Sequence, residues 1–182
     1  MSHRWVAGLG FTAAVLCWVP AGSFAQQPSR VTSVFGDWTV NCALRADKMD
    51  CDLEQMQQPA GQSGPASAIQ ITLAPDGRTA KMGIQVPPDL WIPDGVRLVL
   101  QGKRANSNEK PEDVTVLAVP RWCLATRCLA EADVTADQMK SWQGVETGRI
   151  EFKQANQHNA SIVVSMKGFA AAWKQANKQA AK

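Results

Sequence analysis

Apolar and polar side chains alternate at every second position in many short segments of this sequence, and no other feature constrains its fold as strongly. An alternation of this period places the apolar side chains on one face of a β-strand. The pattern predicts an all-β protein whose antiparallel strands have one buried and one wet face, arranged as a sandwich or a barrel. The segments that show it are 37–42, 50–54, 69–73, 80–86, 96–100, 114–119, 128–132, 148–153 and 161–166.

Two segments depart from this alternation and are predicted to be helical. Thr135 can cap a short helix near residues 135–141, because its hydroxyl can accept a hydrogen bond from an unpaired amide of the first turn. The alanine-rich segment near 168–179 carries Phe169 and Trp173 four residues apart, which places both on one helix face. The chain is expected to end with this helix.

Residues 1–25 have the composition of a secretory signal peptide. An uncharged apolar run, Trp5–Val19, follows a short basic start, and small residues are suitably placed for cleavage after Ala25. A run of fifteen residues is short for a membrane span, which needs about twenty, and no second run follows. A retained N-terminal anchor is the alternative. We predict a flexible leader over residues 26–34 and a single domain over residues 35–182, with no membrane span in the mature chain.

The five cysteines become four in the predicted mature chain, because Cys17 leaves with the signal peptide. An exported chain with an even number of cysteines is expected to form disulfides. The four that remain are Cys42, Cys51, Cys123 and Cys128.

Strand phase favours disulfides between neighbours in the sequence. If Cys42 faces Cys51 across a hairpin, the same register places Val40 opposite Leu53, so that two facing pairs are apolar. The other two cysteines would close a loop of four residues. The crossed alternatives, 42–123 with 51–128 and 42–128 with 51–123, remain open.

Composition argues against several classes of function. The 19 basic residues are scattered and nearly matched by 16 acidic ones, which is not typical of a nucleic-acid-binding protein. His158, the single histidine of the mature chain, lies in a predicted loop, so no catalytic triad is available. The cysteine spacings match neither a zinc knuckle nor a redox-active Cys-x-x-Cys motif. We therefore predict no catalytic residue, no metal site and no cofactor.

Two tryptophans and two arginines form the candidate interaction surface. Trp91 and Trp122 lie in loop-like contexts, and Arg121 and Arg127 flank the second of them. Exposed aromatic and arginine side chains are typical of binding surfaces. The expected partner is a protein, or a component of the envelope or of a host surface, and not a nucleic acid.

An exported enzyme that uses carboxylates and arginine in place of histidine is the alternative function. Such an enzyme needs a deep pocket with two buried carboxylates, for example Asp50 with Glu131. The spacing of the acidic residues along their segments favours solvated strand faces instead.

Four motifs occur in the order found in a known family. They are Phe35–Cys42 followed by Cys51, Pro88-x-Leu90-Trp91-x-Pro93-x-Gly95-Val96, Cys123-x4-Cys128, and Ser165–Phe169 ahead of the final helix. By these motifs the sequence resembles the invasion-associated locus B family of exported bacterial proteins.

This resemblance implies a compact immunoglobulin-like β-sandwich in the periplasm or on the outer surface. Founding members of the family are linked to the entry of bacteria into host cells, and most members have no assigned biochemical activity. The sequence departs from the family pattern at Arg121, Trp122 and Arg127, where smaller residues are more usual. These departures concern binding specificity and not the fold. The expected function is that of a non-enzymatic binding module of the bacterial envelope.

Overall fold

The computed structural model describes residues 29–46, 48–57, 67–74, 78–101 and 113–180. Antiparallel strands dominate this part of the chain, so the predicted all-β class is confirmed. The strands are β1 (Arg30–Phe35), β2 (Trp38–Arg45), β3 (Lys48–Gln57), β4 (Ser67–Leu73), β5 (Thr79–Val86), β6 (Val96–Leu100), β7 (Val114–Cys123), β8 (Cys128–Thr135), β9 (Thr147–Lys153) and β10 (Asn159–Ser165). The helices are η1 (Ile92–Asp94, a 3₁₀ turn), α1 (Ala136–Trp142) and α2 (Phe169–Ala180).

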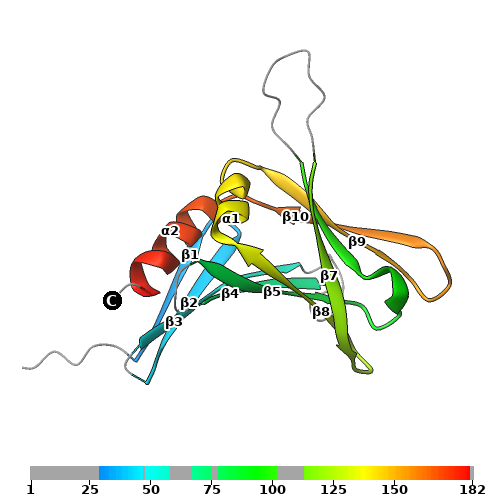
Figure 1. Ribbon diagram of the computed structural model, residues 1–182, viewed down its shortest axis with the longest axis horizontal. Helices are drawn as coiled ribbons and strands as arrows, with labels where there is room; N and C mark the ends of the chain where they lie inside the picture. Colours follow the sequence, from blue (N-terminus) through cyan, green and yellow to red (C-terminus); the bar gives the residue numbers. More distant parts are fainter. Residues whose placement is uncertain (1–28, 47, 58–66, 75–77, 102–112, 181–182) are drawn as a thin grey trace, which may run out of the picture.

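The strands form one curled sheet in the order β1-β2-β3-β4-β5-β8-β7-β6-β9-β10 (Figure 1). Strand β7 makes the sheet continuous because it changes partner half-way: its first half pairs with β6 and its second half pairs with β8. The expected immunoglobulin-like sandwich would have two separate sheets. Here the bent strand β7 carries hydrogen bonding from one part to the other, so the observed arrangement differs in this respect.

Part of the predicted flexible leader is a strand, which corrects the expectation for residues 26–34. Residues Arg30–Phe35 form β1 and pair with β2 through a two-residue turn. The side chains of Val31, Ser33 and Phe35 are half-buried and alternate with exposed ones. The sequence pattern was weak because an edge strand tolerates the polar Thr32 and Ser33.

Strands β2 and β3 pair in the register predicted from the cysteines. Val40 lies opposite Leu53 and Cys42 lies opposite Cys51. All four side chains are buried in one apolar core that extends under the whole sheet. Burial of both facing pairs explains why the register is well specified, since a slip of one residue would expose them all.

Both predicted helices are present: α2 covers strands β1 to β4, and α1 follows β8 and packs its Trp142 against Phe169 of α2 (Figure 1). Thr135 caps α1 in a capping box with Gln138, which satisfies two backbone amides at once. On α2, the buried Phe169 packs edge-on against Trp38 of β2, with ring centroids 5.1 Å apart. This contact fixes the C-terminal helix α2 to strand β2.

The two ends of the curled sheet meet at a contact that we call the clasp, made by Gly36, Asp37, Ser165, Lys167 and Gly168. The Asp37 amide donates to the Lys167 carbonyl at 3.1 Å, and the Ser165 hydroxyl donates to the Asp37 carboxylate at 2.6 Å. Gly168 has φ +91°, and a Cβ at this position would lie 1.9 Å from the Phe35 carbonyl oxygen. Only glycine allows the two backbones to approach so closely.

Candidate functional site

The β7–β8 hairpin brings together three of the four predicted interaction residues, Arg121, Trp122 and Arg127. All three are exposed, and Trp122 is 43% exposed. The Cys123–Cys128 disulfide closes the hairpin, and the Leu124 amide donates to the Arg127 carbonyl at 2.7 Å within its turn. The backbone at the end of this hairpin is therefore held by a covalent bond and a tight turn.

A β-bulge in β7 turns Trp122 toward solvent. Val119 pairs with Glu131 and Trp122 pairs with Leu129, so three residues of β7 span two on β8. Without the extra residue, Trp122 would follow the phase of the buried Ala118 and point inward. The bulge places it instead on the outer face with Val119.

We define the hairpin patch as Val119, Arg121, Trp122, Leu124 and Arg127. Its three apolar members are 52%, 43% and 54% exposed. The Arg121 guanidinium pairs with Glu131 at 3.2 Å, whereas Arg127 forms no ion pair with any described residue. The patch thus combines large apolar side chains with at least one unneutralised positive charge, as binding hot spots do.

Trp91 is not part of this patch. It is half-buried, and its amide donates to the Lys153 carbonyl at 2.7 Å. Lys153 also forms an ion pair with Asp94 at 2.5 Å, and this contact, ahead of the smaller effects of other neighbours, lowers the pKa of Asp94. Trp91 therefore has a local structural role at the start of η1.

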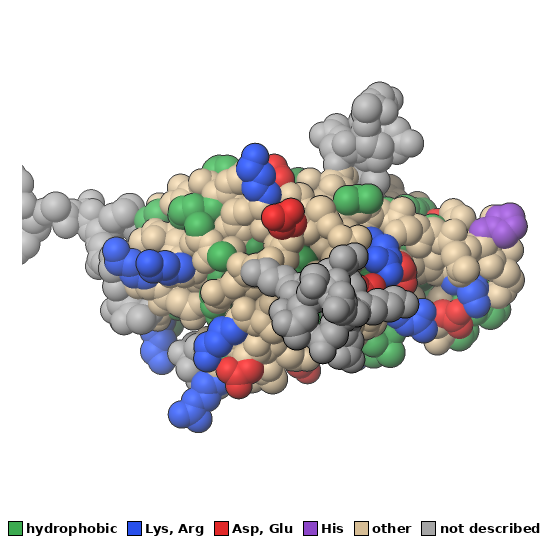
Figure 2. Space-filling model, turned by 90° about the horizontal axis from the view of Figure 1, so that it is seen from above, with side chains coloured by type: hydrophobic (Ala, Val, Ile, Leu, Met, Phe, Trp, Pro, Cys, Tyr) green, Lys and Arg blue, Asp and Glu red, His purple; other side chains and the backbone are tan. Residues whose placement is uncertain are grey.

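The carboxylates required by the enzyme alternative are not brought together. Asp50 on β3 and Glu131 on β8 are separated by β4 and β5, and each contacts an arginine of its own. The only buried polar or charged side chains among the described residues are Gln55 and Ser67. His158 is exposed at one end of the molecule (Figure 2). The described residues include no group of three or more side chains that could hold a metal ion.

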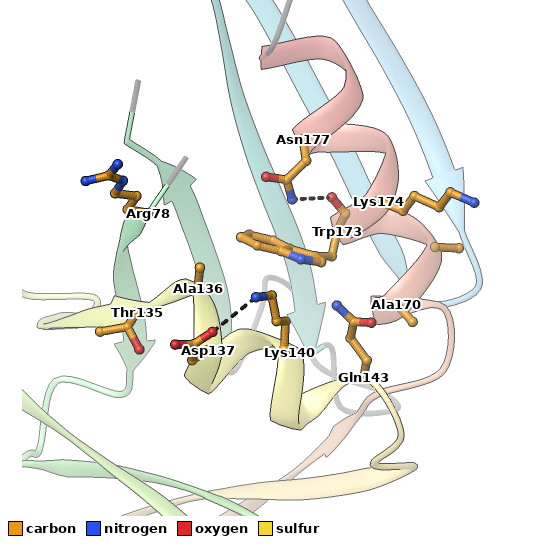
Figure 3. Close-up of a pocket in the computed structure, with 11 residues that line it drawn as sticks. Arg78, Thr135, Ala136, Asp137, Lys140, Gln143, Ala170, Trp173, Lys174 and Asn177 are labelled. Atoms are coloured by element: carbon orange, nitrogen blue, oxygen red, sulfur yellow. Dashed lines mark hydrogen bonds and ion pairs between the residues drawn. The ribbon is translucent and has the colours of Figure 1, made fainter. Parts of the chain in front are cut away.

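A groove of about 980 Å³ between α1 and α2 was missed by sequence analysis (Figure 3). Trp173 of α2 and Lys140 of α1 lie between the two helices, and the Lys174 side chain points away from them. Lys140 pairs with Asp137 at 3.1 Å, and both side chains are largely exposed. The groove is open, and its lining surface is more apolar than polar. No local pattern predicts it, because it depends on how two distant helices pack.

Charged side chains are distributed in small clusters of both signs on the face shown in Figure 2, without a broad basic field. Among the described residues, no helix is long and apolar enough to cross a membrane. The fold and the surface together define a disulfide-linked, antiparallel β-protein whose distinctive surface features are an apolar patch and a shallow groove.

Comparisons with known proteins identify the family. The model of the invasion associated locus B (IalB) family matches residues 38–177, and the chain belongs to this family. The crystal structure of invasion associated protein B from Bartonella henselae has a similar fold, with a TM-score of 0.67 and 17% identity over 81% of this chain and 95% of that one. None of the curated proteins compared with the sequence matches it.

Proposed function

We propose that the protein is exported, loses residues 1–25, and acts in the periplasm or at the cell surface as a non-enzymatic binding module. The observation that carries this proposal is the hairpin patch, in which Trp122 and Leu124 are exposed beside Arg121 and Arg127. Large apolar side chains that are fixed in an exposed position favour binding, because little conformational entropy is lost when a partner covers them.

Two further observations support this proposal. Two disulfides favour an oxidising compartment, where such bonds persist. Asp50 and Glu131, the pair named for the enzyme alternative, lie on strands separated by β4 and β5 and each contacts its own arginine. The name of the family extends the proposal to a contribution to host-cell invasion, with a component of the envelope or of the host surface as the partner.

The test is a binding experiment with the fluorescently labelled mature chain and two membrane preparations, the bacterium's own envelope and host-cell membranes. We expect saturable binding to one of them, and we expect Trp122→Ala to weaken it by at least about tenfold, as hot-spot truncations do. Met56→Ala is the matched control, because Met56 is 61% exposed on β3, far from the hairpin. Equal binding by both variants would reject the hairpin patch as the binding surface.

Export is tested separately by mass spectrometry of the protein purified from its own cells. The expected product begins at Gln26 and has no free thiol. Its peptides should be linked 42–51 and 123–128 under non-reducing conditions. A chain that retains residues 1–25, or that carries free thiols, would contradict the export proposal.

A further inference from the structure

We propose that two copies of the chain associate through β10, which pairs in antiparallel orientation with the β10 of the second copy. The proposal does not depend on the hairpin patch, which lies on a different strand. β10 is the last strand of the sheet, and β9 is the one strand that flanks it in the described part of the chain. No strand of the described part of the chain pairs with its other edge, which we call the open edge.

The hydrogen bonds at both ends of the β9–β10 pair show which way each β10 residue directs its backbone. The Gln154 amide donates to the His158 carbonyl at 2.8 Å, and the Met166 amide donates to the Glu146 carbonyl at 2.9 Å. Bonded positions alternate along an antiparallel strand. Even-numbered residues of β10 thus bond to β9, and odd-numbered residues direct both their N–H and their C=O groups toward the open edge.

The clasp occupies one end of this edge. The Ser165 carbonyl accepts hydrogen bonds from the Trp38 indole at 3.0 Å and from the Gln55 side-chain amide at 2.7 Å. The remaining odd-numbered positions have no backbone partner among the described residues, and each presents one N–H and one C=O group. These positions are Asn159, Ser161 and Val163.

The side chains of β10 offer no protection against pairing. Residues Asn159–Ser165 include no charged residue and no proline, and Val163 is 69% exposed. Proteins that keep a sheet edge monomeric usually place lysine, proline or a bulge there. The opposite edge strand, β1, begins with the charged Arg30 and packs against α2. The unprotected edge therefore favours β10 as the contact.

The open positions also fix the register. With the two-fold axis at Ser161, Asn159 lies opposite the partner's Val163, and Ser161 lies opposite the partner's Ser161. All three open residues then form bonded pairs, which gives six hydrogen bonds between the chains. Ala160 lies opposite the partner's Ile162 on the other face, so a small side chain meets a branched one. An axis at Ile162 would place Asn159 opposite the partner's Ser165, whose carbonyl already accepts two hydrogen bonds at the clasp.

Sedimentation equilibrium of the mature chain over about 1 to 500 µM tests the association. We expect a monomer–dimer equilibrium that Val163→Pro weakens by at least about tenfold, because proline removes an N–H that points to the partner and not to β9. Val34→Pro is the matched control, since Val34 is also 69% exposed on an edge strand. The Leu44 amide bonds the Ser29 carbonyl, so the Val34 N–H also points outward.

A monomer at all concentrations would overturn the proposal. Dissociation by both proline variants would also overturn it, because that result indicates head-to-tail pairing of β1 with β10. The register is tested by oxidative cross-linking. Ser161→Cys should form a covalent dimer, because Cα atoms of a bonded pair lie about 5.5 Å apart. Val163→Cys should not, since it lies opposite the partner's Asn159. The reverse result would overturn the register.

Discussion

Replacing Gly168 by alanine is the sharpest test of how the sheet is closed. At φ +91° a side chain is strained by about 1–2 kcal/mol, and the new Cβ would lie 1.9 Å from the Phe35 carbonyl oxygen. The backbones of the clasp must therefore separate. Separation weakens the bond from the Asp37 amide to the Lys167 carbonyl and the two bonds to the Ser165 carbonyl, each worth about 1 kcal/mol.

Together these contributions predict that Gly168→Ala lowers the free energy of unfolding by about 3–5 kcal/mol. For a domain of this size the change corresponds to a fall in Tm of about 10 °C. Urea unfolding followed by tryptophan fluorescence measures it directly. Gly83→Ala is the control, because its Cβ would make an ordinary contact at 3.4 Å with Leu129 and should change stability by less than about 1 kcal/mol. A loss below about 1 kcal/mol in Gly168→Ala would refute the role of the clasp.

Three further predictions concern single side chains. Thr135→Ala should cost about 1 kcal/mol in urea unfolding, because α1 loses its capping box, and no change would contradict the role of the cap. Trp142→Phe should destabilise less than Trp38→Phe, because the buried Trp142 indole has no hydrogen-bond partner among the described residues whereas the Trp38 indole donates to a carbonyl. The opposite ranking by thermal unfolding would contradict this argument. The ion pair with Lys153 lowers the pKa of Asp94 from its ordinary value of 3.8. The charged Asp94 therefore stabilises the fold at pH values above 3.8, and this stabilisation is lost as the pH falls through the lowered pKa. The stability difference between wild type and Asp94→Asn, from urea unfolding at several pH values, should shrink over that range, and a constant difference would contradict it.

The sequence predicted the parts of the fold that are set by local pattern. Alternation identified the strands, and the positions of Cys42 and Cys51 fixed one register, because a side-chain period of two leaves little choice once a face is buried. Strand β1 escaped detection because its three inward positions are only partly buried and one of them, Ser33, is polar. β1 is stabilised by pairing with β2, and this pairing cannot be predicted from the residues of β1 alone.

The candidate site was predicted in part. The bulge in β7 cannot be recognised from the sequence, although it explains why Trp122 is exposed where simple alternation would bury it. Trp91 was grouped with the hairpin because both tryptophans lie in loop-like contexts, whereas its contacts are with Asp94 and Lys153. Which side chains lie together at a surface depends on long-range packing, and composition and spacing do not predict it.

The first and last of the four motifs lie away from the candidate binding residues. The Gly36-Asp37-Trp38 and Lys167-Gly168-Phe169 motifs meet at the clasp and the adjoining core, where backbone contact and burial leave few alternatives. The hairpin patch lies at an exposed strand end, where a disulfide fixes the backbone and the side chains can change without cost to the core. A family built this way can keep its fold while each member presents different side chains on the hairpin. Exchanging the hairpin between two members should therefore transfer binding preference and leave unfolding unchanged.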